Sequence, residues 1–277
     1  MGRQALELLR VHDNDRYLSI QFAPAALRDD LAGLFALDIE LSRVENLVTE
    51  PLNGELRLTW WREALARPGE STGNPVADEV TRAMVAHGLA SSDFEAMIDA
   101  RRLDLYNQPV VDLTELTSYF ADTTGTALKL AARVLGSQTR QLADLCIGAA
   151  LVLGLTRMAE HLASGPARTV SRLIPDEFLR QLPDGEVAVR QYITPELQAG
   201  ILAQLLRQAN ETWTTLRAPI EQLPKALLPV FLPLAVVPGA LRRYARCVPV
   251  AGKFTGPLPR YRRVLKLLIN GRRARIV

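Results

Sequence analysis

Apolar residues recur at spacings of three and four along nearly the whole chain, and this periodicity constrains the fold more than any other feature. The pattern is clear from the first third of the chain, where it includes Leu27, Leu31, Leu34 and Leu41. Such spacings place side chains on one face of a helix. No stretch alternates apolar and polar residues for long enough to form a sheet. The sequence therefore predicts an all-α fold, a single-domain helical bundle of about eight to ten helices.

Several helices can be placed from their start and stop signals. One is predicted from residue 112 to a stop at Gly136, and the next, over 137–164, is the most apolar and is expected at the centre of the bundle. A long helix is predicted to begin at Pro195, because proline suits the first turn. Trp60 and Trp61 point to different faces, which predicts one core residue and one exposed residue.

The longest apolar run, residues 226–241, is shorter than a membrane span and is interrupted by Pro229, Pro233 and Pro238. A buried, kinked core helix is the expectation.

The N-terminal residues lack the apolar stretch of a secretory signal. Two distant cysteines and three histidines without metal spacing give no zinc signature and indicate a reducing compartment. We expect a cytoplasmic protein. A peripheral position at the inner face of a membrane is compatible with this expectation.

Charge is distributed unevenly along the chain. Residues 222–277 hold twelve of the 33 lysines and arginines and none of the 30 acidic residues, which leaves the first 221 residues with a net charge of −9. A basic amphipathic segment of this kind is typical of contact with an anionic membrane surface or a protein partner. Nucleic acid is not expected, because no recognised module is present. The alternative is that the basic segment docks on the acidic body. The residues predicted to make membrane or partner contact are Arg262, Arg263, Lys266, Arg272 and Arg273.

Four acidic residues fall between positions 35 and 51, a stretch with helical periodicity. A continuous helix would place Asp38, Ser42, Glu45 and Thr49 on one stripe. Mg²⁺ bound with a diphosphate takes oxygen ligands, so a helix that holds it needs two carboxylates one turn apart. The partner position of Glu45 is Thr49, and the stripe is incomplete as a metal site.

Two segments, 24–65 and 115–128, resemble the squalene/phytoene synthase family, and the similarity extends over roughly residues 15–245. The resemblance implies a helical bundle of the isoprenoid synthase type, and an activity that joins two prenyl diphosphates with Mg²⁺. We divide the chain accordingly into a helical domain, 1–245, and a basic C-terminal segment, 246–277. The matching residues are Pro24, Arg28, Leu58, Trp61, Arg62, Glu115, Leu116, Tyr119, Gly125 and Thr126.

The departures from the family pattern shape the functional hypothesis. The first Asp-x-x-x-Asp would fall on Glu45 and Thr49, and residues 145–165 contain a single carboxylate, Glu160, where a second aspartate-rich motif is expected. Without those carboxylates a departing diphosphate would lose its Mg²⁺. The pattern resembles the non-catalytic branch of the family, which includes a respiratory complex I assembly factor. The leading hypothesis is a non-catalytic assembly or scaffold protein with a protein partner and no metal or cofactor.

Two alternatives stay open at this stage. One is an active prenyl diphosphate transferase of isoprenoid biosynthesis, which would need Mg²⁺ and several carboxylates in one cavity. The other is a protein that binds an isoprenoid lipid without metal. For residues of the former pocket, the competing explanations are surface ion pairs or ordinary hydrogen bonds within the bundle. The residues proposed to line that pocket are Asp38, Glu45, Asp99, Asp104, Tyr119, Arg157, Glu160 and His161.

Overall fold

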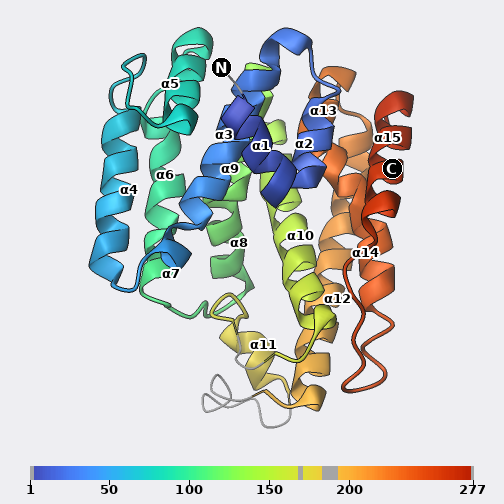
Figure 1. Cartoon of the computed structure of the whole chain (residues 1–277). Coiled ribbons are helices and arrows are strands. Elements are labelled where there is room, and N and C mark those ends of the chain that lie inside the picture. The colour runs from blue at the N-terminus through green and yellow to red at the C-terminus, as the bar shows by residue number, and fades with distance from the viewer. Residues whose placement is uncertain (1–2, 168–170, 183–192, 276–277) are drawn as a thin grey trace.

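The computed structural model describes residues 3–167, 171–182 and 193–275, and within them the chain forms helices and no strands (Figure 1). This confirms the predicted fold class. The α-helices are α1 (Arg3–His12), α2 (Asn14–Ile20), α3 (Arg28–Ser42), α4 (Pro51–Leu65), α5 (Pro75–His87), α6 (Ser92–Ala100), α7 (Arg102–Leu105), α8 (Leu113–Asp122), α9 (Thr124–Val134), α10 (Arg140–Ser164), α11 (Asp176–Arg180), α12 (Pro195–Glu221), α13 (Leu228–Phe231), α14 (Val237–Tyr244) and α15 (Arg260–Arg273). Short 3-10 helices are η1 (Ala25–Leu27), η2 (Val44–Leu47), η4 (Lys225–Leu227) and η5 (Leu232–Val236).

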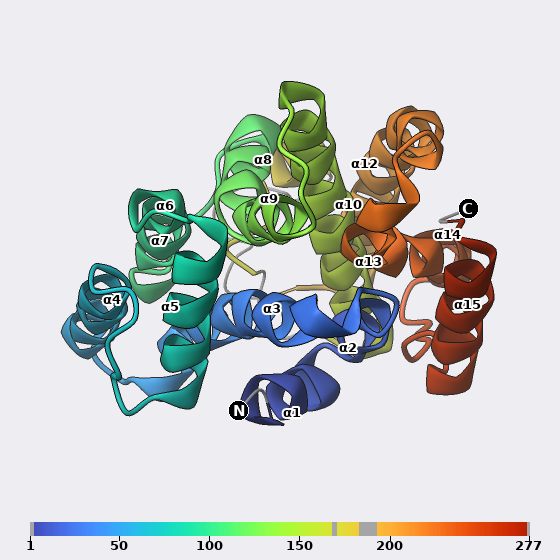
Figure 2. The ribbon, with the colours of Figure 1, turned by 90° about the horizontal axis from the view of Figure 1, so that it is seen from above.

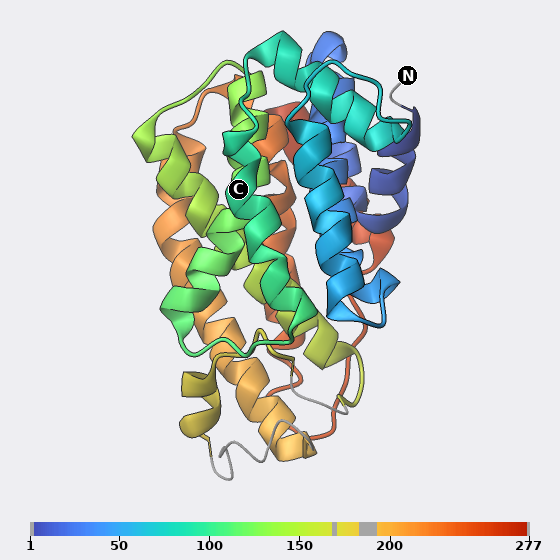
Figure 3. The same ribbon diagram turned by 90° about the vertical axis from the view of Figure 1, so that its left-hand side faces the viewer.

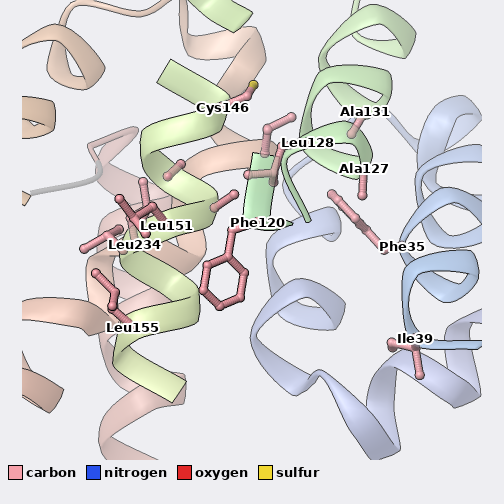
Figure 4. Packing of buried hydrophobic residues seen from close by; sticks show 14 of the residues in the cluster. Phe35, Ile39, Phe120, Ala127, Leu128, Ala131, Cys146, Leu151, Leu155 and Leu234 are labelled. Carbon is pink, nitrogen blue, oxygen red and sulfur yellow. The ribbon is translucent and has the colours of Figure 1, made fainter. Parts of the chain in front are cut away.

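Helix α10 lies in the middle of the bundle, as its apolar composition predicted (Figure 2). It packs against α8 and α9 on one side and against α12 and α14 on the other. Figure 4 shows Phe120 of α8 lying against α10, the helix that carries Leu151 and Leu155. Gly154 allows this approach, because a Cβ at that position would lie only 2.3 Å from the Phe120 ring.

The stretch 35–51, which has helical periodicity, is broken before α4. The chain leaves α3 at Ser42, passes through η2, and starts α4 with Pro51 in its first turn. Gly54 lies inside α4 and faces Leu105, where a Cβ would come within 2.3 Å of a leucine methyl. Helices α4 and α6 then run side by side along one flank (Figure 3). Trp61 is buried and Trp60 is exposed, as predicted.

The predicted helix over 112–136 is divided at Thr123 into α8 and α9. Asp112 caps α8 by accepting a hydrogen bond from the Glu115 backbone N–H at 2.8 Å. Breaks of this kind raise the number of helices in the described residues above the predicted eight to ten. By contrast, α12 runs unbroken from Pro195 to Glu221, as expected.

The proline-rich run is buried, as predicted, but it is divided into short elements and is not one kinked helix. Pro229, Pro233 and Pro238 each lie in the first turn of a short helix, and together they split the run into α13, η5 and α14. By length and composition alone, two helical segments of the described chain, Arg140–Ser164 and Lys225–Tyr244, would be able to cross a membrane. The second segment is therefore longer than the apolar run 226–241, which the sequence analysis judged too short for a membrane span. Most of each apolar window is buried inside the bundle, as in core helices of soluble proteins, so this is weak evidence for a span.

Candidate functional site

A cavity of about 620 Å³ opens between α3, α8 and α10 and the segment that follows residue 170. Its wall combines polar groups from α2, α3 and α7 with apolar groups from α8 and α10. The lining residues are Arg16, Asp38, Ile39, Ser42, Glu45, Arg101, Asp104, Asn107, Pro109, Tyr119, Phe120, Thr123, Thr124, Leu153, Gly154, Arg157, Met158, Ser171, Arg172 and Leu173. Four of these residues are arginines, and the net charge of the cavity depends on which carboxylates form ion pairs with them.

Asp38 on α3 is held by two arginines and is only 4% exposed. Arg16 Nη1 donates to Asp38 Oδ2 at 2.9 Å, and Arg101 Nη2 donates to Asp38 Oδ1 at 2.9 Å. The Thr124 hydroxyl also donates to Oδ2, at 3.3 Å. Burial alone would raise the pKa of Asp38, but Arg16 and Arg101 outweigh it and hold that pKa at about 2. Both carboxylate oxygens are therefore occupied and the group is ionised.

Asp104 on α7 is engaged in the same way. The Tyr119 hydroxyl donates to Asp104 Oδ1 at 2.9 Å and accepts from Arg101 Nη1 at 2.8 Å. Arg101 Nη1 also lies 3.4 Å from Asp104 Oδ2, and Arg172 forms an ion pair with Oδ1. Burial raises the pKa of Tyr119, so its hydroxyl keeps the proton that it donates. Burial lowers the pKa of Arg172 to about 10, which still leaves a cation at neutral pH.

Asp13, just before α2, completes the inner network. Its Oδ1 accepts from the Arg16 backbone N–H at 3.1 Å and caps α2, and Oδ2 forms ion pairs with the side chains of Arg16 and Arg157. Burial would raise the pKa of Asp13, but Arg157 and Arg16 lower it below its ordinary value. The chain of ion pairs thus runs without interruption from Arg157 through Asp13, Arg16 and Asp38 to Arg101.

A second ionic cluster lies beside this network, at a small cavity of about 40 Å³. Arg263 of α15 donates to Asp15 Oδ2 at 2.5 Å and to Glu160 Oε2 at 3.1 Å. The Tyr244 hydroxyl donates to the same oxygen of Glu160 at 2.5 Å. Glu160, the single acid of residues 145–165, is thus held by an arginine and a tyrosine.

The structure brings five of the eight predicted pocket residues to the main cavity, namely Asp38, Glu45, Asp104, Tyr119 and Arg157. The other three do not line it. Asp99 lies on the surface and pairs with Arg62 at 2.6 Å, Glu160 lines the small cavity, and His161 is exposed. The predicted stripe is also broken: α3 ends at Ser42, so Glu45 belongs to η2 and Thr49 lies outside the cavity.

Sequence reasoning missed Asp13, which lines the small cavity, and Arg16, Arg101 and Arg172, which line the main one. The only available signal for Asp13 and Arg16 was the charged string His-Asp-Asn-Asp-Arg at 12–16, which looks like an ordinary helix start. Arg101 is the single residue between α6 and α7, and Arg172 lies in the segment before α11. Both are far from α3 in the chain, so no helical periodicity links them to it.

The donor set of the cavity does not fit Mg²⁺. Within the described residues, no group of three or more His, Cys, Asp or Glu side chains is arranged to hold a metal ion. Mg²⁺ needs free carboxylate oxygens in octahedral geometry, whereas both oxygens of Asp38 and of Asp104 already meet arginine or tyrosine donors.

Three buried guanidinium nitrogens of cavity-lining arginines have no hydrogen-bond partner among the described residues, and one of them, Arg172 Nη2, forms the ion pair with Asp104. The other two are Arg16 Nη2 and Arg101 Nε. A buried donor without an acceptor is costly, so Arg16 and Arg101 each keep one unsatisfied donor beside the cavity.

Comparison with known proteins assigns the chain to a family. The squalene/phytoene synthase family model matches residues 9–247. The chain belongs to the squalene/phytoene synthase family. The resemblance carried by residues 24–65 and 115–128 is thereby confirmed.

The related curated proteins carry another name. The chain is 32% identical over 133 residues to NADH dehydrogenase (ubiquinone) complex I, assembly factor 6, of Mus musculus. It is 29% identical over 133 residues to the protein of the same name in Homo sapiens. Each match covers 47% of this chain and 40% of the relative, so the similarity spans less than half the length of either protein.

Solved structures agree on the fold. A ligand-bound dehydrosqualene synthase superposes with a TM-score of 0.67 at 12% identity, covering 97% of this chain and 94% of that one. A squalene synthase from Alicyclobacillus acidocaldarius gives a TM-score of 0.57 at 15% identity, covering 99% and 94%. At these identities the likeness establishes the helical architecture alone.

Proposed function

We propose that this protein is a non-catalytic assembly or scaffold factor of the respiratory complex I type, built on the prenyl synthase fold without its aspartate-rich metal motifs. The observation that carries the proposal is the pairing of Asp13, Asp38 and Asp104 with arginines. A prenyl diphosphate transferase has to stabilise a departing diphosphate, usually through carboxylate-bound Mg²⁺. In this chain, arginines pair with Asp13, Asp38 and Asp104, and the positions expected for the first motif hold Glu45 and Thr49.

The relation to complex I assembly factor 6 supports the same proposal from an independent direction. A scaffold needs a stable fold and an accessible surface, and neither requires a metal. The ion-pair network joins α2, α3, α7 and α10 across the bundle. We infer that it has a structural role, with a protein partner as the functional ligand.

The test is calorimetric titration of the purified chain with a thio-substituted farnesyl diphosphate, with and without Mg²⁺. An active dehydrosqualene synthase in the same buffer serves as the positive control. The proposal expects no heat of binding that depends on Mg²⁺. Tight binding that appears only with Mg²⁺, together with turnover of farnesyl diphosphate, would overturn it in favour of the transferase.

A second test concerns the partner. Deletion of the gene in its own organism is expected to reduce assembled complex I, measured by native gel and NADH oxidation, while isoprenoid products are unchanged. Rescue by the wild-type gene is the control. Unaltered complex I, or a loss of isoprenoid products, would contradict the assembly role.

One observation favours a second candidate, a metal-free site for an isoprenoid lipid with an anionic head. The buried N–H groups of Arg16 and Arg101 face no protein acceptor, and the same cavity has apolar walls from Ile39, Phe120 and Leu153. Arginine binds phosphate without metal through charge-assisted hydrogen bonds. Equal binding of the farnesyl analogue with and without Mg²⁺ would support this candidate over the scaffold.

A further inference from the structure

Helix α15 carries a row of exposed apolar side chains along its outer face. Tyr261 is 66% exposed, Leu265 55%, Leu268 37% and Ile269 39%. At 100° per residue these four positions fall within one arc of about 100°. An exposed apolar row on a helix of a soluble domain indicates a surface that contacts something.

Arginines border the same row. Arg262, Arg272 and Arg273 are exposed, and none of them forms an ion pair with a carboxylate among the described residues. The helix has no acidic residue at all, and the last acid before it in the chain is Glu221. We call this set, Tyr261, Arg262, Leu265, Leu268, Ile269, Arg272 and Arg273, the outer face of α15.

The other two basic residues predicted to make membrane or partner contact turn toward the bundle. Arg263 pairs with Asp15 and Glu160, and Lys266 Nζ lies 3.5 Å from the carbonyl oxygen of Ala235. Burial lowers the pKa of Lys266. The structure therefore divides the five predicted residues into three that are presented outward and two that fasten the helix.

The inner side of α15 fixes its orientation. The helix packs on α2 and η5, with Leu267 fully buried. Gly271 permits close packing on Phe22, whose ring would be 2.2 Å from a Cβ at that position. Figure 2 shows α15 at the edge of the bundle, where no other helix of the described chain lies outside it. The outer face is thus presented on a docked helix.

We propose that the outer face of α15 docks on an anionic phospholipid bilayer. The three arginines contact lipid phosphates, while Tyr261, Leu265, Leu268 and Ile269 enter the boundary between head groups and acyl chains. A basic amphipathic helix with this division of faces lies in the plane of such an interface. The proposal goes beyond the assembly role and does not depend on it.

Charge complementarity favours a bilayer over an acidic protein. A membrane surface repels any carboxylate near it, and the chain has none over the 56 residues from 222 to 277. A protein interface needs complementary charge only at its contacts, so it gives no reason for acids to be missing from so long a segment.

The experiment is co-sedimentation of the full chain with vesicles of phosphatidylcholine alone, or of phosphatidylcholine with 40% phosphatidylglycerol, at about 0.1 M NaCl. Binding is expected only to the anionic vesicles. Each basic residue near an anionic surface contributes roughly a 5-fold factor in partitioning. Changing Arg262, Arg272 and Arg273 to Glu is therefore expected to weaken binding by at least about 100-fold.

The matched control changes Arg140, Arg180 and Arg207 to Glu. These arginines are also exposed, and the control alters the net charge equally. It is expected to bind within about 10-fold of the wild type. A second variant, Leu265→Ala with Ile269→Ala, keeps the charge and is expected to lose about 10-fold or more, because less apolar surface enters the interface.

Three outcomes would overturn the proposal. They are no binding of the wild type to anionic vesicles, equal losses in the charge variant and its control, or a charge variant that loses binding while the apolar variant does not. The last outcome would indicate a purely electrostatic surface, such as one for an acidic protein. Thermal melting of each variant verifies that it is folded.

Discussion

The cavity and the outer face of α15 use the same residue, arginine, in opposite ways. In the cavity, Arg16 and Arg101 are buried and share Asp38 between them. On α15, Arg262 and Arg273 are exposed, and neither forms an ion pair with a carboxylate of the described chain. A buried guanidinium needs a carboxylate to offset its lost hydration, whereas an exposed one stays hydrated and available. Pairing therefore separates charges that hold the fold from charges that can meet a partner.

The largest effect is expected from breaking the inner network. Asp38→Ala removes the carboxylate between Arg16 and Arg101 and leaves both cations buried. The free energy of unfolding, measured by urea denaturation, is expected to fall by about 3–5 kcal/mol. The matched variant Asp99→Ala breaks the exposed pair with Arg62 and is expected to cost less than about 1 kcal/mol. Equal losses would mean that the cavity pairs behave as surface pairs.

Acid should weaken the same network. The pKa of Asp38 in the fold, about 2, lies below its ordinary value of 3.8. The stabilisation is therefore present above about pH 4 and lost as the pH falls through 2, and it amounts to about 2 kcal/mol. Urea denaturation at several pH values between 5 and 2 measures it. Asp38→Asn lacks the titrating group, so its penalty relative to the wild type should shrink by that amount over this range, and a constant penalty would contradict the assignment.

Neighbouring arginines on α15 sharpen the comparison within one helix. Arg263 pairs with Asp15 and Glu160, and Arg262 pairs with no carboxylate among the described residues. Arg263→Ala is expected to lower the free energy of unfolding by about 1–2 kcal/mol, because it leaves partly buried carboxylates without their donor. Arg262→Ala makes the same change in charge and is expected to stay within about 0.5 kcal/mol of the wild type. A reversed order would refute the division of α15 into two faces.

The smallest effect on stability is expected at the end of α15. Arg272→Ala combined with Arg273→Ala should leave the thermal midpoint nearly unchanged, since both side chains are exposed. The same variant should lose roughly 25-fold in binding to anionic vesicles. Thermal melting and co-sedimentation on one sample separate the two effects. A large drop in the thermal midpoint would mean that Arg272 and Arg273 help to hold α15 on the bundle, as Arg263 and Lys266 do.

Helical periodicity was enough to predict the fold class, because nearly every helix buries one apolar face. Apolar composition predicted α10 at the centre, and the proline signal predicted the start of α12 at Pro195. Boundaries were harder. The stretch 35–51 has helical spacing throughout, yet α3 ends at Ser42, and no glycine or proline marks that end in the sequence.

The candidate site was only half accessible from the sequence. Asp38 could be proposed from the acidic stripe over residues 35–51, and Asp104 and Tyr119 through the family resemblance, and all three line the cavity. Their arginine partners could not, because an arginine 63 positions away from Asp38 has no local pattern that reveals the pair. Pairing is a property of the folded chain, and it decides whether a carboxylate is available to a metal.

The central claim, that arginines hold Asp38 and Asp104 in place of a metal, is tested most directly by electron paramagnetic resonance with Mn²⁺. Mn²⁺ takes the same oxygen ligands as Mg²⁺, and its free-ion signal disappears on binding. With inorganic diphosphate present, the account predicts that about 0.1 mM protein leaves the free signal equal to that of a protein-free sample with the same Mn²⁺ and diphosphate, and that wild type and Asp38→Asn behave alike. Uptake of one or more Mn²⁺ per chain that Asp38→Asn or Asp104→Asn abolishes would contradict it.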